Sequence, residues 1–178
     1  MIRILGIDPG SRLTGFGLIE TSGNRSICVT TGCIRTEGTN LASRLKHIHL
    51  DISSLIEEFA PEEVAIESIF MHRNADSALK LGQARGAALS AVAVQNLPVH
   101  EYTPSQIKKA VVGKGNASKQ QVQHMVKVML ALPGQPQADA ADALAAALCH
   151  GHMRNQPIPV ASRRGGRWNE TELKGRLT

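Results

Sequence analysis

The first 36 residues contain three apolar runs separated by short turns. The runs cover residues 2–8, 10–20 and 25–36, and glycine or asparagine lies in the links between them. Gly10 is available for the first tight turn. Runs of this length, joined this closely, predict three strands in an antiparallel meander.

Helical spacing replaces this pattern after residue 40. Leu45, Ile48, Ile52 and Ile56 recur every three or four residues, which predicts an amphipathic helix that ends before Pro61. The following segments are a strand at 63–68, a helix at 75–95, a strand at 97–102, helices beginning at 104 and 119, and a final helix through 139–148. This order predicts an α/β fold with a mixed five-stranded sheet and helices on both faces.

Four acidic residues stand out within these elements. Asp8 ends the first strand, and Glu67 ends the strand after the first long helix. Consecutive elements usually lie adjacent and crossovers are right-handed, so these two strand ends can be neighbours. Asp139 and Asp142 are three residues apart on the final helix, which places both carboxylates on one face. We therefore treat the four acids as one candidate catalytic cluster.

Four carboxylates in one pocket repel one another unless cations are present. Mg²⁺ prefers carboxylate and water oxygens, and two such ions about 3.5–4 Å apart can promote phosphodiester cleavage. The cluster therefore predicts a site for two Mg²⁺ ions. A simpler alternative is that Asp139 and Asp142 are acids favoured by the helix dipole, and that Asp8 is a turn residue before Pro9.

Charge is distributed unevenly along the chain. The net charge is +5, yet no acidic residue lies between Glu101 and Asp139. This interval contains five lysines, namely Lys108, Lys109, Lys114, Lys119 and Lys127. A basic stripe in a nearly neutral body indicates a polyanionic partner such as nucleic acid, although a solvated helix face has the same composition. Lys114 lies between two glycines, so we expect it on a mobile basic loop that contacts DNA.

Length and composition limit the class of protein. The chain has 178 residues, and no apolar run approaches the roughly 20 residues that span a bilayer. We expect one domain at residues 1–152, a basic tail without stable structure at 153–178, and a cytoplasmic protein that does not associate with membranes. The three cysteines (Cys28, Cys33 and Cys149) are expected to be reduced.

Three segments together resemble the RuvC-type Holliday junction resolvases: GIDPGSRLTGFG, AIESIFMHRNADSALKLGQARG and PQADAADALA. The resemblance extends from residue 2 to about residue 150. It implies an RNase H-like fold, a homodimer, and Mg²⁺-dependent nicking of two opposed strands at a four-way DNA junction, with Mn²⁺ as a substitute ion. It also implies a role in recombination and repair, 5′-phosphate and 3′-hydroxyl products, and cooperation with the RuvA and RuvB branch-migration proteins.

The resemblance also assigns roles to individual residues. It implies that the catalytic, metal-binding carboxylates are Asp8, Glu67, Asp139 and Asp142. Phe70 would lie by the junction centre and touch an unpaired base, and Lys108 and Lys119 match basic positions that contact DNA near the cut. Nothing functional carries over to the tail.

Other functions remain open on sequence alone. DPGSRLTGFG also resembles the first phosphate loop of actin- and sugar-kinase-like ATPases, but such enzymes need a second lobe for which this length leaves no room. An RNase H-like nuclease acting on RNA or on other branched DNA is a second alternative. A non-catalytic junction-binding module is a third, disfavoured because all four acids are present.

Two smaller features have competing interpretations. Gly82 and Gly86 are four residues apart on the second predicted helix, which suits either a dimer interface or packing within the chain. The histidine pairs His47/His49 and His150/His152 are expected to be surface or packing residues, because hard-ion chemistry does not need imidazole.

Overall fold

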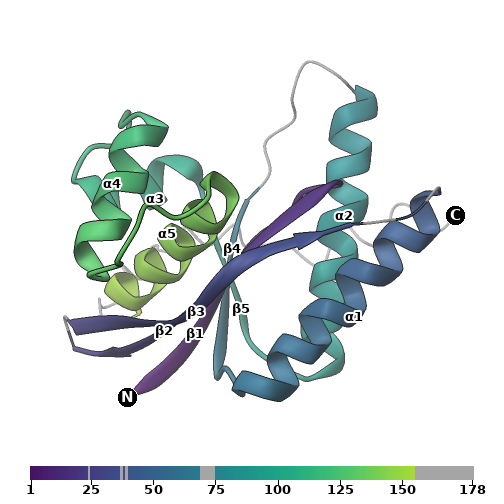
Figure 1. Ribbon diagram of the computed structural model, residues 1–178, viewed down its shortest axis with the longest axis horizontal. Helices are drawn as coiled ribbons and strands as arrows, with labels where there is room; N and C mark the ends of the chain where they lie inside the picture. The colour runs from purple at the N-terminus through teal and green to yellow at the C-terminus, as the bar shows by residue number, and fades with distance from the viewer. Residues whose placement is uncertain (24, 37, 39, 69–74, 155–178) are drawn as a thin grey trace, which may run out of the picture.

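A five-stranded sheet separates two groups of helices, with α1 and α2 on one face and α3, α4 and α5 on the other (Figure 1). The computed structural model describes residues 1–154 except 24, 37, 39 and 69–74. The strands are β1 (Ile2–Asp8), β2 (Leu13–Ser22), β3 (Arg25–Arg35), β4 (Glu63–Glu67) and β5 (Val99–Tyr102). The helices are α1 (Leu41–Phe59), α2 (Ala75–Val94), α3 (Pro104–Val112), α4 (Lys119–Met129) and α5 (Ala138–Met153). The predicted α/β class, the mixed sheet and the helices on both faces are confirmed.

The central strand, β1, determines which strand ends meet. The sheet order is β3-β2-β1-β4-β5, and β1 pairs antiparallel with β2 and parallel with β4. In the parallel register Ile7 lies opposite Ile66. The next residues, Asp8 and Glu67, therefore end neighbouring strands at the same edge, which confirms the predicted adjacency.

Alternation along β1 places Asp8 on the face covered by α5. Leu5 and Ile7 belong to the core formed with α1 and α2, whereas Ile4 belongs to the core formed with α3, α4 and α5. Successive side chains point to opposite faces of a strand. Asp8 therefore projects to the same side as Ile4.

The same alternation orients both ends of β4. Val64 and Ile66 pack toward α1 and α2, while Ala65 packs toward α5. Glu63 and Glu67 share the side of Ala65 and lie at opposite ends of the strand. One face of the sheet thus carries a carboxylate at each end.

α5 lies very close to β1 and β2 because glycines face it. A Cβ atom on Gly6 would lie 1.9 Å from the carbonyl oxygen of Ala143, and one on Gly15 would lie 2.0 Å from that of Asp139. Gly15 is also the register partner of Asp8. Glycine on the strands and alanine on the helix therefore let the backbones approach, and the contact places Asp139 beside the end of β1.

The predicted helix starts are confirmed by the capping geometry. Thr103 and Ser118 form capping boxes with Gln106 and Gln121, and Pro104 is the first residue of α3. Within the described ranges, no helix combines the length and apolarity needed to cross a bilayer. The three cysteines are free thiols, as expected.

The last helix reaches slightly past the predicted domain boundary. α5 ends at Met153, and Arg154 caps it and forms an ion pair with Glu63, with 2.9 Å between Nη2 and Oε1. These two residues therefore pack with the folded domain. The boundary after residue 152 stays a prediction, and residues 155–178 of the expected tail lie outside the described residues.

Candidate active site

Three of the four predicted acids line one cavity of about 360 Å³ where β1 and β4 end. Asp8 and Glu67 reach it from the strands, and Asp142 reaches it from α5. Asp139 lies in the first turn of α5, and its charge acts on Asp8 although it is not among the lining residues. The structure thus brings the predicted acids together at one end of the sheet.

Burial and mutual repulsion disfavour the charged forms of these acids. Burial, followed by the charges of Asp142, Glu67 and Asp139, raises the pKa of Asp8 to about 7. Burial is also the main cause of the raised pKa values of Glu67 and Asp142. Strongly perturbed carboxyl groups in a cavity are typical of functional sites. A bound cation would favour the ionised forms of these carboxyl groups.

Two of the predicted lysines lie at this cavity. Lys119 Nζ lies 3.4 Å from Asp142 Oδ2, and the lysine side chain is 78% exposed. The charge of Asp142 raises the pKa of Lys119, so the ammonium form is favoured. Lys108 lines the cavity from α3. The site therefore combines carboxylates with two cations at its border, which suits a substrate that carries negative charge.

The two remaining residues predicted to contact DNA are Lys114 and Phe70, and their contacts with DNA stay predictions. Lys114 is exposed in the connection between α3 and α4 and does not line the cavity. Its carbonyl oxygen accepts a hydrogen bond from the Ala117 N–H at 3.3 Å, so the connection forms a turn. Phe70 lies outside the described residues.

Sequence reasoning missed the apolar part of the cavity wall. Leu81 of α2, Ile107 of α3 and Val122 of α4 contribute to the lining. No sequence signal distinguishes them, because each also fits the ordinary apolar spacing of its helix. Their presence lowers the local dielectric constant, which strengthens the electrostatic interactions of the neighbouring charged groups.

A second group of ligand-type side chains lies at the other end of the same sheet face. Glu63, His100 and His150 each offer one ligand atom, and these atoms lie within 4.8 Å of one another, a criterion that the acids of the cavity do not meet in the described chain. His150 is buried, as expected of a packing histidine, and His49 bonds to Ser90 at 2.9 Å. Of the four histidines expected to be surface or packing residues, this cluster includes His150, and it adds His100, which sequence reasoning did not single out.

The fold and the acidic cavity together define an RNase H-like nuclease. The donor set at the cavity consists of carboxylates, which suit a hard divalent cation that prefers oxygen ligands. The adjacent lysines suit the phosphate groups of a nucleic acid.

The chain belongs to the RuvC family of crossover junction endodeoxyribonucleases. The family model with the description "Crossover junction endodeoxyribonuclease RuvC" matches residues 4–150. A protein of that name from Shewanella sp. (strain W3-18-1) is 55% identical over 163 residues, which cover 92% of this chain and 94% of the relative. Its counterpart from Hahella chejuensis is 54% identical over 162 residues, which cover 91% and 94%.

Solved structures agree with this assignment. T. thermophilus RuvC, in complex with a Holliday junction substrate, superposes with a TM-score of 0.81 at 34% identity, covering 86% of this chain and 95% of that chain. The yeast mitochondrial Holliday junction resolvase Ydc2 superposes with a TM-score of 0.58 at 14% identity, covering 85% and 78%. The latter likeness supports the fold alone.

Proposed function

We propose that this chain resolves four-way (Holliday) DNA junctions by paired nicking of two opposed strands, in homologous recombination and DNA repair. The observation that carries the proposal is the cavity in which Asp8, Glu67 and Asp142 lie beside Lys119, in a chain of the RuvC family. Each nick would be a phosphodiester hydrolysis that leaves a 5′-phosphate and a 3′-hydroxyl.

Two Mg²⁺ ions are the proposed cofactors, with Mn²⁺ as a substitute, and their ligands would be Asp8, Glu67, Asp139 and Asp142. Bound Mg²⁺ supplies activation of water and stabilisation of the leaving oxygen. The carboxylates must be ionised to act as ligands, so Asp8, whose pKa is about 7 in the protein alone, would release its proton when the ions bind. These residues fit Mg²⁺ because all four proposed ligands are carboxylates, and Mg²⁺ prefers oxygen ligands.

The proposed DNA contacts follow from charge and exposure. Lys119 forms one ion pair of 3.4 Å with Asp142, and its side chain is mostly exposed. Its ammonium group can therefore turn toward a phosphate near the cut. Lys108 would contact the same strand from α3, and Lys114 would contact a phosphate farther from the cavity. Phe70 would touch an unpaired base at the junction centre, where stacking on an aromatic ring is worth about 1–3 kcal/mol per base.

A homodimer is proposed because one face of α2 lacks a partner within the described chain. Leu79, Gly82 and Gly86 share this face by their spacing. Leu79 is 62% exposed, and a Cβ atom added to either glycine would meet nothing within 4 Å. This supports the dimer interpretation of the glycine pair over packing within the chain. A two-fold dimer would present one acidic cavity to each of the two opposed strands.

The remaining parts of the proposal rest on family membership and on charge. Cooperation with RuvA and RuvB and a cytoplasmic location belong to the proposed role in recombination. The proposed tail, residues 153–178, carries six basic and two acidic residues. It would add non-specific DNA affinity without being needed for nicking.

The test is cleavage of a synthetic four-way junction with a mobile centre, with and without Mg²⁺, with products sized at nucleotide resolution. We expect symmetric cuts in two opposed strands only when Mg²⁺ is present, and no cuts in linear duplex DNA. Equal or faster cleavage of an RNA–DNA hybrid would instead support an RNase H-like nuclease of different specificity. Junction binding without any cleavage would support a non-catalytic module.

A further inference from the structure

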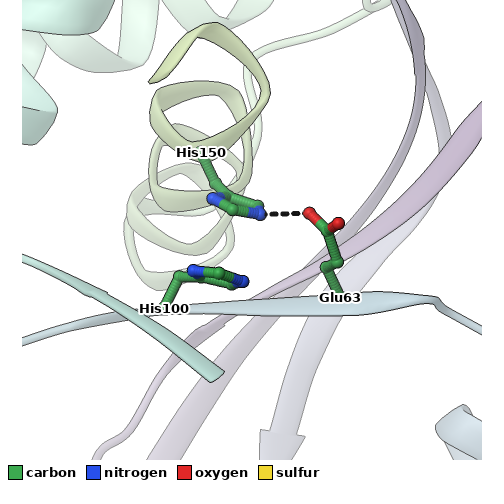
Figure 2. Close-up of side chains that lie close together, drawn as sticks. All are labelled: Glu63, His100 and His150. Atoms are coloured by element: carbon green, nitrogen blue, oxygen red, sulfur yellow. Dashed lines mark hydrogen bonds and ion pairs between the residues drawn. The ribbon is translucent and has the colours of Figure 1, made fainter. Parts of the chain in front are cut away.

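A glutamate and two histidines converge at the end of the sheet opposite the acidic cavity. Glu63 is the first residue of β4, His100 lies on β5, and His150 lies near the end of α5 (Figure 2). Their ligand atoms lie within 4.8 Å of one another. Three elements that are distant in sequence therefore bring two imidazoles and one carboxylate to one point.

The imidazole rings of His100 and His150 are stacked on each other. Their centroids are 4.1 Å apart and their planes differ by 23°. In Figure 2 each ring presents a nitrogen on the side where the Glu63 carboxylate lies. Zn²⁺ bonds of about 2.0–2.2 Å place tetrahedral ligand atoms about 3.4 Å apart, so small side-chain rotations would complete such a site.

Tyr102 forms a hydrogen bond with the ring nitrogen of His150 that faces away from Glu63. The Tyr102 hydroxyl lies 2.6 Å from His150 Nδ1, while Nε2 of the same ring faces Glu63. A histidine that binds metal through one ring nitrogen usually donates a hydrogen bond from the other, which fixes the tautomer and the ring orientation. In the metal-bound form His150 would carry its proton on Nδ1 and donate it to the Tyr102 phenol oxygen, so the Nε2 lone pair would be directed at the point between the three ligands.

Arg154 forms hydrogen bonds with both carboxylate oxygens of Glu63. Its Nη2 lies 2.9 Å from Oε1, and its Nε lies 3.1 Å from Oε2. The arginine side chain is 30% exposed, so it can keep the contact with Oε1 and yield Oε2 to a cation. Within the described part of the chain, Arg154 donates to this carboxylate through Nη2 and Nε, and His150 Nε2 forms a hydrogen bond with Oε2.

We propose that Glu63, His100 and His150 form a binding site for Zn²⁺ or a similar transition-metal ion, separate from the acidic cavity. A set of two imidazoles and one carboxylate suits zinc better than Mg²⁺, which prefers oxygen ligands. Water or an external ligand would take the fourth position. The ion would fasten the end of α5 to β4 and β5, and α5 carries Asp139 and Asp142 at its other end.

The test is titration of the full, chelator-treated chain with Zn²⁺ in excess Mg²⁺, so that the acidic cavity does not compete. We expect one Zn²⁺ per chain by calorimetry. At a hundredfold excess of free Zn²⁺ over its Kd, Tm should rise by roughly 5–10 °C. Co²⁺ bound at the same site should give the visible absorption of a tetrahedral ion.

The variants separate a metal site from a structural hydrogen-bond network. His100→Ala and Glu63→Gln should abolish the zinc-dependent rise in Tm, and Tyr102→Phe should weaken Zn²⁺ binding by about 10–100-fold. His49→Ala, which changes a histidine on α1 at the opposite face of the sheet from α5, should bind Zn²⁺ normally. His100 is only partly buried, so its removal is compatible with folding.

Two results would overturn the proposal. The first is the absence of stoichiometric Zn²⁺ binding in excess Mg²⁺. The second is binding that is equally strong in the wild-type protein and in the His100→Ala and Glu63→Gln variants. Neither result bears on junction cleavage, because the readouts are binding and thermal stability.

Discussion

Asp8 illustrates how the acidic cavity lowers the free energy of unfolding when no cation is bound. Burial and three neighbouring acids raise the pKa of its carboxyl group to about 7 from 3.8. Between these two values the unfolded chain releases its proton while the folded chain retains it. The free energy of unfolding therefore falls as the pH rises from about 4 to about 7, by the linkage of protonation to folding.

Asp8→Asn should stabilise the metal-free protein at neutral pH although it removes a proposed ligand. The amide does not titrate, so the Tm advantage over the wild type should grow from pH 4 to pH 7 and then level off. Thermal unfolding in EDTA across this range measures it, with Asp51→Asn on the exposed side of α1 as the control. Nicking in Mg²⁺ should be lost while junction binding is retained. A variant less stable than the wild type at every pH would show that burial and repulsion do not penalise the ionised Asp8 carboxylate.

Lys108 and Lys119 should each contribute one phosphate contact. Replacing either by alanine should reduce the slope of log binding constant against log salt concentration by about 1, because one fewer counterion is released. Gel-shift titrations of a four-way junction in Ca²⁺ measure the slope. Lys46→Ala, an exposed lysine on α1 across the sheet, is the matched control. Unchanged slopes in both lysine variants would mean that these side chains face solvent in the complex.

At the scale of elements, the position of α5 depends on glycines that face it. Gly6→Ala should lower the free energy of unfolding by about 1–3 kcal/mol, because the new methyl group would overlap the Ala143 carbonyl oxygen. Gly15→Ala should in addition slow nicking, since it displaces Asp139. Urea unfolding and junction cleavage measure the two effects. Gly134→Ala, where a Cβ atom meets nothing within 4 Å, should be close to wild type. Wild-type stability of Gly6→Ala would contradict the packing account.

The sequence predicted the elements well because their periodicities are strong and their caps are explicit. Three signals follow from local rules: the apolar run at residues 2–8, the stripe from Leu45 to Ile56, and the Thr103 and Ser118 caps. The adjacency of Asp8 and Glu67 could also be predicted, because the chirality of crossovers constrains parallel strands. The proposed roles of these acids as metal ligands stay predictions.

The second cluster, the apolar cavity wall and the close packing of α5 depend on tertiary contacts that no local sequence pattern encodes. Glu63 and His100 look like ordinary polar residues of a strand, and only the closure of α5 on the sheet brings His150 to them. Leu81 has the same spacing as the other apolar residues of α2, so its place in the cavity wall could not be predicted. The sequence around the strand glycines likewise does not indicate that a helix backbone packs against them.

At the scale of the whole molecule, α5 links two chemically different sites. Asp139 and His150 are eleven residues apart, which corresponds to about 16 Å along a helix. The acidic cavity lies at the first end and the Glu63, His100 and His150 cluster at the second. Anything that fixes the second end of α5 therefore limits the motion of the carboxylates at the first.

Phe70 should matter for the position of the strand rather than for the metal ligands. In a dimer, two copies of this residue would lie near the branch point. Phe70→Ala should therefore retain folding, dimerisation and Mg²⁺ binding while losing most junction cleavage. Circular dichroism, sedimentation, calorimetric titration with Mg²⁺ and cleavage assays measure these four properties. Phe59→Ala, at a partly buried core residue of α1, shows what loss of stability alone would do. Full cleavage by Phe70→Ala would remove this residue from the site.

The most direct measurement of the central claim is cleavage of a supercoiled plasmid that extrudes one cruciform. A dimer that cuts both opposed strands before dissociating converts the plasmid to linear product in Mg²⁺. The Glu67→Gln variant should bind the cruciform but leave the plasmid uncut. We predict linear DNA as the main first product of the wild-type chain. Accumulation of nicked circles ahead of linear product, or a chain that remains monomeric on the junction, would contradict paired resolution by two acidic cavities.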